Sequence, residues 1–154
     1  RQCVRLRRHQ RVARRQRPRG GGVVNRAGRW TELDRIVSVE PGSGAKALRN
    51  VTNTLDILDS HFPRFPVMPG VLILGSMGEL AAVLLREQTG REWRLAGAKQ
   101  VRYRHFVQPG DQMEITVQVK DVGDDTAVLK GDVAVDGKPV TTARELRMVP
   151  ADGA

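Results

Sequence analysis

One apolar stretch, residues 67–85, constrains the fold of this chain more than any other feature of its sequence. The stretch follows a proline-rich loop, and its only ionisable residue is Glu79. Its spacing predicts a helix over residues 69–88, with proline in the first turn and Gly90 as the C-cap. Because apolar residues recur on every side of this helix, we expect protein to surround it. The interruptions by proline, glycine and Glu79 argue against a membrane span.

Strand-like segments flank this helix on both sides. An irregular segment from residue 30 leads into a short strand that ends near residue 39, and residues 52–60 have the composition of a polar loop. Alternation of apolar and polar residues predicts further strands over residues 45–51, 94–106, 112–122, 126–135 and 138–149. Asp136-Gly137 is a strong hairpin signal between the last two. This order predicts an α+β fold in which one antiparallel sheet wraps the helix.

The net charge of +9 belongs to the beginning of the chain. Residues 1–22 contain nine arginines and no acid, and subtracting nine from 26 leaves 17 basic residues against 17 acidic ones. We expect residues 1–22 to form a disordered leader, residues 23–150 a single domain and residues 151–154 a tail. The leader has no aromatic side chain for stacking on bases, so we expect no specific nucleic-acid binding, with non-specific attraction to polyanions as the alternative.

Cysteine usage and hydropathy bear on the compartment. The single cysteine, Cys3, excludes a disulfide within the chain, which is typical of a reducing compartment. No run of bilayer length is free of charged or helix-breaking residues. The sequence therefore predicts a cytoplasmic protein without a membrane span, and we expect no bound metal.

Two motifs on either side of the helix start resemble a known family. His61-Phe62-Pro63 and Pro66-Val67-Met68-Pro69-Gly70-Val71-Leu72-Ile73 resemble the signature of FabZ-type (3R)-hydroxyacyl-[acyl-carrier-protein] dehydratases. The resemblance covers about residues 33–148 and includes Pro109-Gly110-Asp111. It implies the hot-dog fold, a curled antiparallel sheet around one central helix. It also implies conversion of carrier-bound (3R)-hydroxyacyl thioesters to trans-2-enoyl thioesters in fatty-acid or polyketide synthesis. The substrate is then carried on phosphopantetheine, and no cofactor is required.

Such a dehydration needs three groups. A base removes a proton from C2, an acid protonates the hydroxyl that leaves C3, and a polar group stabilises the thioester oxygen. The resemblance implies His61 as base or acid, and the backbone N–H of Gly70, at the positive end of the helix, as partner of the carbonyl. It also implies that Phe62, Met68 and Val71 contribute to the substrate site.

Two positions in the helix depart from the family pattern. Gly75 stands where the family carries its catalytic Glu or Asp, and Glu79 stands where it carries Gln. The two positions are about one turn apart, roughly 6 Å along the axis. Glu79 is therefore a relocated acid, a buried structural carboxylate, or a partner for arginine at a dimer interface. In the family's dimer the histidine of one subunit lies near the carboxylate of the other. The chain is thus expected to form a homodimer, or a heterodimer in which a related subunit supplies the acid.

Basic residues near the motifs suggest a partner. Arg64, Arg102 and Arg104 are candidates for contact with the acyl carrier protein or its phosphopantetheine phosphate, with solvated surface charge as an equal alternative. His9 and His105 are expected to be structural or solvated. The alternative functions are a non-catalytic or half-site dehydratase subunit, and a hot-dog protein that binds or hydrolyses acyl thioesters.

Overall fold

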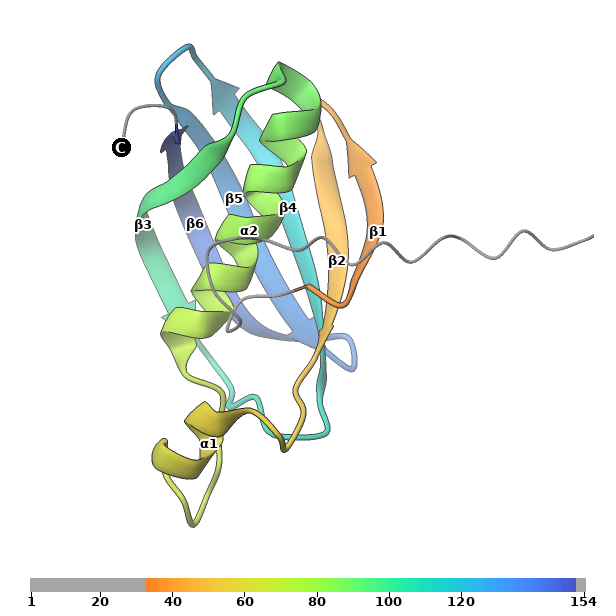
Figure 1. Cartoon of the computed structure of the whole chain (residues 1–154), viewed down its shortest axis with the longest axis vertical. Coiled ribbons are helices and arrows are strands. Elements are labelled where there is room, and N and C mark those ends of the chain that lie inside the picture. Colours follow the sequence, from red (N-terminus) through yellow and green to blue (C-terminus); the bar gives the residue numbers. More distant parts are fainter. Residues whose placement is uncertain (1–32, 152–154) are drawn as a thin grey trace, which may run out of the picture.

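The structure is a computed structural model that describes residues 33–151. Six strands form one antiparallel sheet, and one long helix lies across one of its faces (Figure 1). In chain order the elements are β1 (Arg35–Glu40), β2 (Gly44–Asn50), α1 (Asp56–Ser60), α2 (Gly70–Thr89), β3 (Trp93–Tyr103), β4 (Gln112–Val122), β5 (Ala127–Val135) and β6 (Lys138–Pro150). The predicted α+β architecture, a curled sheet with a central helix, is confirmed.

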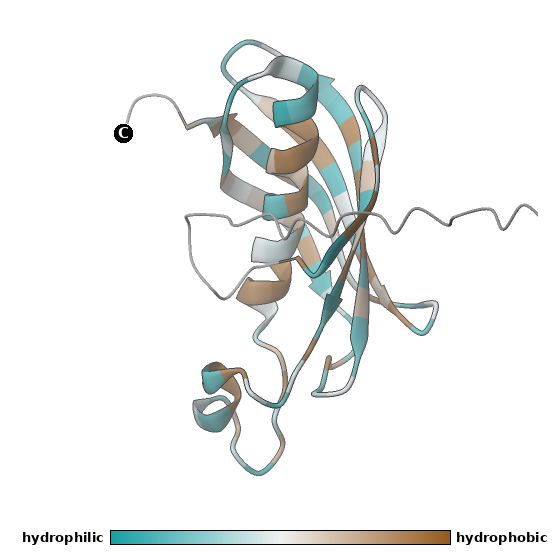
Figure 2. Ribbon diagram, turned by 45° about the vertical axis from the view of Figure 1, so that its right-hand side comes forward, coloured by the Kyte–Doolittle hydropathy of each residue, from teal (hydrophilic) through white to brown (hydrophobic). Residues whose placement is uncertain are grey.

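The order of strands across the sheet is β1-β2-β4-β5-β6-β3. The strands β4, β5 and β6 form a meander, and the turn between β5 and β6 has positive φ at Asp136 and Gly137, as a tight hairpin requires. After α2 the chain returns through β3 to the far edge, where Tyr103 pairs with Thr141 of β6. Hydrophobic and hydrophilic residues alternate along the strands (Figure 2), so that one face of the sheet turns apolar side chains toward the helix.

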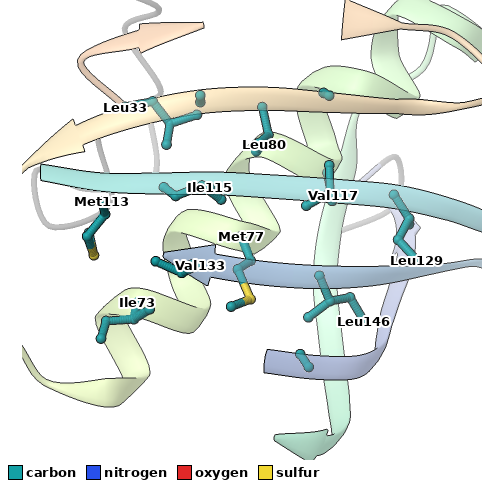
Figure 3. Close-up of a cluster of buried hydrophobic side chains, with 14 of the residues drawn as sticks. Leu33, Ile73, Met77, Leu80, Met113, Ile115, Val117, Leu129, Val133 and Leu146 are labelled. Atoms are coloured by element: carbon teal, nitrogen blue, oxygen red, sulfur yellow. The ribbon is translucent and has the colours of Figure 1, made fainter. Parts of the chain in front are cut away.

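The core lies between α2 and the sheet. Met77, Leu80 and Leu84 of the helix are fully buried, and Ile73 and Met77 face strand residues such as Val133 and Leu146 (Figure 3). The backbone of β5 approaches the helix closely at Gly131, where an added Cβ would meet the sulfur of Met77 at 2.7 Å. This packing fixes the distance between the helix and the sheet. The first turn of α2 is therefore positioned by the contacts that the whole helix makes with the sheet.

The helix is confirmed to within one residue of the predicted bounds. It ends at Gly90, whose φ of 72° is left-handed and whose N–H donates to Arg86 O. The expectation that protein covers it on every side is wrong for a single chain. A strip of α2, here called the open strip, keeps partial or full solvent exposure because the sheet covers only the opposite side; it consists of Val71, Leu72, Leu74, Gly75 and Ala82.

Two smaller differences concern the segments around the helix. Residues 52–60, predicted as a loop, contain the short helix α1, whose Leu58 is buried in the core. Strand β3 ends at Tyr103 instead of residue 106, which leaves Arg104 and Phe106 in the connection to β4. The predicted leader, residues 1–22, lies outside the described residues. Within residues 33–151, no helix has both the length and the apolarity needed to cross a bilayer.

Candidate active site

His61 directly follows α1, and its ring is held by the loop that leads to α2. Its backbone N–H donates to Ile57 O at 2.9 Å, and its Nδ1 lies 2.9 Å from Val67 O. Because a carbonyl oxygen only accepts, Nδ1 donates in this contact, and the lone pair of a neutral imidazole is then on Nε2. The ring is half-buried. His61 is thus held in the tautomer that a general base requires.

The backbone of this loop is strained next to the histidine. Phe62 has φ of 56°, in a left-handed region that bulky residues rarely adopt. Its ring packs edge-on against the imidazole with centroids 4.7 Å apart, and 63% of the side chain is exposed. Further along, Met68 N–H donates to Val107 O at 2.7 Å, which ties the loop to the β3–β4 connection. The predicted contact residue Met68 is itself buried in the core.

The first turn of α2 has backbone N–H groups without a hydrogen-bond acceptor inside the helix. Pro69 precedes the helix without a side-chain cap, and the N–H groups of Leu72 and Ile73 both donate to Pro69 O. The N–H groups of Gly70 and Val71 come earlier than any intrahelical acceptor can reach. They point along the positive end of the helix dipole, which favours a partly negative oxygen. Val71, predicted to contact substrate, is 69% exposed.

Tyr103, at the end of β3, packs directly on this turn. A Cβ added to Gly70 would lie 2.7 Å from Tyr103 Cε1 and 2.8 Å from Cζ, which is closer than real carbon atoms approach. Position 70 must therefore remain glycine for the phenol ring to reach the start of α2. Sequence reasoning did not single out Tyr103, and the available signal was that it is the only tyrosine of the chain.

Glu79 lies deeper in α2 and away from the histidine of its own chain. It is nine residues beyond Gly70, so about 13 Å further along the axis, whereas His61 is bonded just before the helix. Glu79 as a whole residue is 6% exposed. Gly75, one turn closer to the start, belongs to the open strip. Within one chain the structure therefore brings His61 and Gly70 to the same end of the helix and does not bring Glu79 there.

A buried polar contact joins the helix to β2 near Glu79. Arg49 is 3% exposed, and its Nη1 donates to Ser76 Oγ at 2.7 Å. The Ser76 hydroxyl in turn donates to Leu72 O at 3.0 Å. Ser76 and Glu79 are three residues apart and thus neighbours on one helix face. The guanidinium of Arg49 therefore lies on the face of α2 that carries Glu79, which favours the structural interpretation of this carboxylate.

Replacement of Arg49 by alanine is expected to lower the free energy of unfolding by about 3 kcal/mol. The change removes a buried charged donor and leaves polar groups of α2 without it. Urea unfolding followed by circular dichroism measures the effect. The matched control is Arg35→Ala on β1, where the arginine is exposed and the change should stay within about 0.5 kcal/mol. Equal stability of Arg49→Ala and the unchanged protein would contradict the prediction.

The predicted basic residues are close in sequence to the two rings of an exposed aromatic pair. Phe65 and Phe106 pack edge-to-face with centroids 5.7 Å apart, although 52% and 72% of their side chains are exposed. Arg64 lies in the His61 loop, and Arg102 and Arg104 flank Tyr103; all three are exposed. His105 is also exposed, and His9 lies outside the described residues. Among residues 33–151, no group of three or more His, Cys, Asp or Glu side chains is gathered as a metal site would require.

Comparisons with known proteins identify the family. Residues 27–144 match the FabA-like domain family. The 3-hydroxyacyl-[acyl-carrier-protein] dehydratase FabZ of Bacillus subtilis (strain 168) is 39% identical over 111 residues, which are 70% of this chain and 79% of the relative. FabZ of Latilactobacillus sakei subsp. sakei (strain 23K) is 39% identical over 114 residues, 72% of this chain and 81% of the relative.

Solved structures agree on the fold. The dehydratase heterocomplex ApeI:P from Xenorhabdus doucetiae gives a TM-score of 0.64 at 15% identity over 78% of this chain and 82% of that chain. The E. coli PaaI protein from the phenylacetic acid degradation operon gives 0.62 at 19% identity over 78% and 80%. These likenesses and the curled six-stranded sheet confirm the predicted hot-dog fold. As the residues around His61 and Gly70 indicated, the chain belongs to the FabA-like family and, within it, to the FabZ-type 3-hydroxyacyl-[acyl-carrier-protein] dehydratases.

Proposed function

We propose that this protein dehydrates (3R)-hydroxyacyl thioesters to trans-2-enoyl thioesters in fatty-acid or polyketide biosynthesis. The acyl chain is carried on the phosphopantetheine arm of an acyl carrier protein. The observation that supports this best is the pairing of a histidine held through Nδ1 with an uncapped helix start a few residues away. We also propose a cytoplasmic location, in line with the single cysteine of the chain.

The proposed chemistry uses both the histidine and the start of the helix. The thioester carbonyl accepts a hydrogen bond from Gly70 N–H, where the helix dipole stabilises the enolate-like charge. Nε2 of His61 takes the proton from C2. The electron pair of that C–H bond forms the C2–C3 double bond, and the C3–O bond breaks. The departing oxygen accepts a proton and leaves as water, so that the products are the enoyl thioester and water.

A half-site subunit is the second candidate, and one observation favours it. Gly75 offers no acid, and Glu79 lies about 13 Å along the helix from Gly70. We therefore propose a dimer, either of two copies or with a related hot-dog subunit that contributes the acid. The open strip and the exposed Phe62 are apolar surfaces that a second subunit would cover. In the heterodimer, this chain contributes His61 to an active site formed by both subunits.

Turnover by the purified protein separates these candidates. Hydration of a crotonyl thioester and dehydration of a 3-hydroxyacyl thioester are followed on carrier protein and on a small pantetheine-like thiol. Turnover by the protein alone supports the self-sufficient dehydratase, and turnover only after co-expression with a partner supports the half-site subunit. Release of free thiol without enoyl product would identify a thioesterase instead. Binding of acyl carrier protein without any reaction would identify a non-catalytic module.

Reversal of charge at Arg64, Arg102 and Arg104 tests the proposed carrier contact. We expect KM for the carrier-bound substrate to rise about tenfold, because each exposed charge contributes up to about 1 kcal/mol to an acidic partner. The KM for the small thiol substrate should not change, and the difference should shrink at high salt. Arg94→Glu on β3 is the matched control, since this arginine is exposed but lies at the other end of the strand. An equal rise of KM for both substrates would mean that the arginines serve the site itself.

A further inference from the structure

We propose that the phenol of Tyr103 donates the proton to the hydroxyl that leaves C3, in place of the carboxylic acid that is absent at Gly75. This inference rests on the dehydratase function proposed above. It assigns the third group of the reaction to a residue of the same chain. No relocation of Glu79 and no acid from a partner subunit is then needed.

The position of the phenol supports the assignment. Cζ, the ring atom that carries the hydroxyl, lies 2.8 Å from where a Cβ of Gly70 would be. A thioester carbonyl bound to Gly70 N–H has its C3 hydroxyl only two carbons away, so the phenol and the leaving group meet over the same helical turn. The side chain is 51% exposed, which allows a substrate to reach it.

The loop that holds His61 converges on the same turn. His61 Nδ1 is bonded to Val67 O, and Val67 is three residues before Gly70, a chain distance of at most about 10 Å. The hydrogen bond from Met68 N–H to Val107 O holds this loop against the connection that begins just after Tyr103. The base and the proposed donor therefore belong to two segments that meet at the start of α2.

A second hydroxyl group, that of Thr141, lies beside Tyr103 at this end of the sheet. Thr141 pairs with Tyr103 across β3 and β6, and directly opposed residues in antiparallel strands point to the same face. Thr141 is fully buried, and its Oγ1 has no hydrogen-bond partner within residues 33–151. Leaving such a hydroxyl unpaired costs about 1–3 kcal/mol.

The protonation state of the Tyr103 hydroxyl fits the role of a proton donor. Partial burial of the ring raises the pKa of Tyr103 above its ordinary value of 10.0, so the phenol stays protonated throughout the neutral range. In the step itself, the O–H bond of the phenol breaks, its proton joins the departing hydroxide to give water, and a phenolate remains. The imidazolium of His61 and the exposed phenolate then exchange protons with water, which restores both groups.

Tyr103→Phe tests the inference in the full chain. Phenylalanine keeps the ring on Gly70 and removes only the hydroxyl, so we expect kcat to fall about 100-fold, as loss of a general acid predicts, with KM and the melting temperature unchanged. The double variant Gly75→Glu/Tyr103→Phe should recover most of the loss, because a carboxylic acid again supplies the proton. A purely structural tyrosine predicts the same fold-gain in kcat from Gly75→Glu with and without Tyr103→Phe, whereas the acid role predicts a larger gain in the Tyr103→Phe background.

The pH profile gives a second readout. A general acid must be protonated, so activity is lost as pH rises through its pKa. The alkaline limb of kcat should lie above pH 10.0 in the unchanged protein and at much lower pH in the double variant. Because the chain has one tyrosine, tyrosinate absorbance reports the titration of Tyr103 alone. The alkaline limb and the absorbance midpoint should coincide.

The outcomes distinguish this inference from the proposed function. Full kcat in Tyr103→Phe, together with inactivity of His61→Ala, would overturn the role of the phenol and leave the dehydratase intact. Activity that appears only with a partner subunit, and that Tyr103→Phe does not lower, would assign the acid to the partner. No turnover by the unchanged protein under either condition would refute the dehydratase and this inference with it.

Discussion

His61→Ala is expected to lower kcat for dehydration of a 3-hydroxyacyl thioester by about 10²–10⁴-fold, the range that a general acid–base contributes. Alanine offers no basic group at this position to take the proton from C2. The KM should change little, because the carbonyl still binds the backbone N–H of Gly70. Measurement of kcat and KM with a carrier-bound substrate checks both expectations.

His105→Ala is the matched control for this prediction. His105 is exposed in the β3–β4 connection and makes no side-chain contact that the mechanism uses. Its removal should leave kcat within about twofold, in keeping with the small effects of surface substitutions. The melting temperature of both variants is measured as well, because a drop in His61→Ala alone would reflect damage to the loop. A His61→Ala protein that is folded and fully active would refute the proposed mechanism.

Gly75→Glu is expected to raise kcat of the protein alone by about tenfold or more. The substitution adds a carboxylic acid at the position where the family has one, and a carboxylic acid is a stronger proton donor than a phenol. The position is half-buried in the open strip, so the new side chain has access to solvent and to a second subunit. Steady-state kinetics with and without a co-expressed partner measures the gain.

Stability distinguishes a chemical effect from a structural one. Glycine within a helix costs roughly 0.5–1 kcal/mol relative to a good helix former, so both Gly75→Glu and its control Gly75→Gln should unfold at slightly higher denaturant concentration. Only the glutamate variant should gain activity, because the N–H protons of an amide are far too weakly acidic to be transferred to a leaving hydroxyl. An inactive but folded Gly75→Glu would mean that position 75 does not face the reacting atoms in this protein.

The helix and the histidine could be predicted because their signals are local. The run of apolar residues closed by Gly90 defines a helix within twenty positions, and His61 stands in a motif that adjoins it. The short helix α1 was missed because five residues are too few to show a helical period, and nothing in the sequence around Leu58 shows that it is buried. The open strip was missed for a related reason, since hydropathy cannot say which apolar face meets the sheet and which meets another molecule.

The contact between Gly70 and Tyr103 could not be predicted from the sequence. The two residues are 33 positions apart, and their approach depends on where β3 returns to the sheet and where it ends. The position of Glu79 relative to His61 likewise depends on the direction in which the loop enters the helix. In the sequence, Glu79 stands one helical turn beyond Gly75, the position where the family carries its acid. The structure adds that the guanidinium of Arg49 reaches the same helix face.

The strained backbone at Phe62 has a consequence for how this loop tolerates change. A left-handed conformation at a bulky residue costs of order 1 kcal/mol, and glycine would adopt it freely. Glycine would, however, remove the ring that packs edge-on against the imidazole. Position 62 is thus one where thermostability and activity pull in opposite directions. Selection for stability alone would favour glycine at position 62. That substitution would remove the aromatic ring that holds His61 in place.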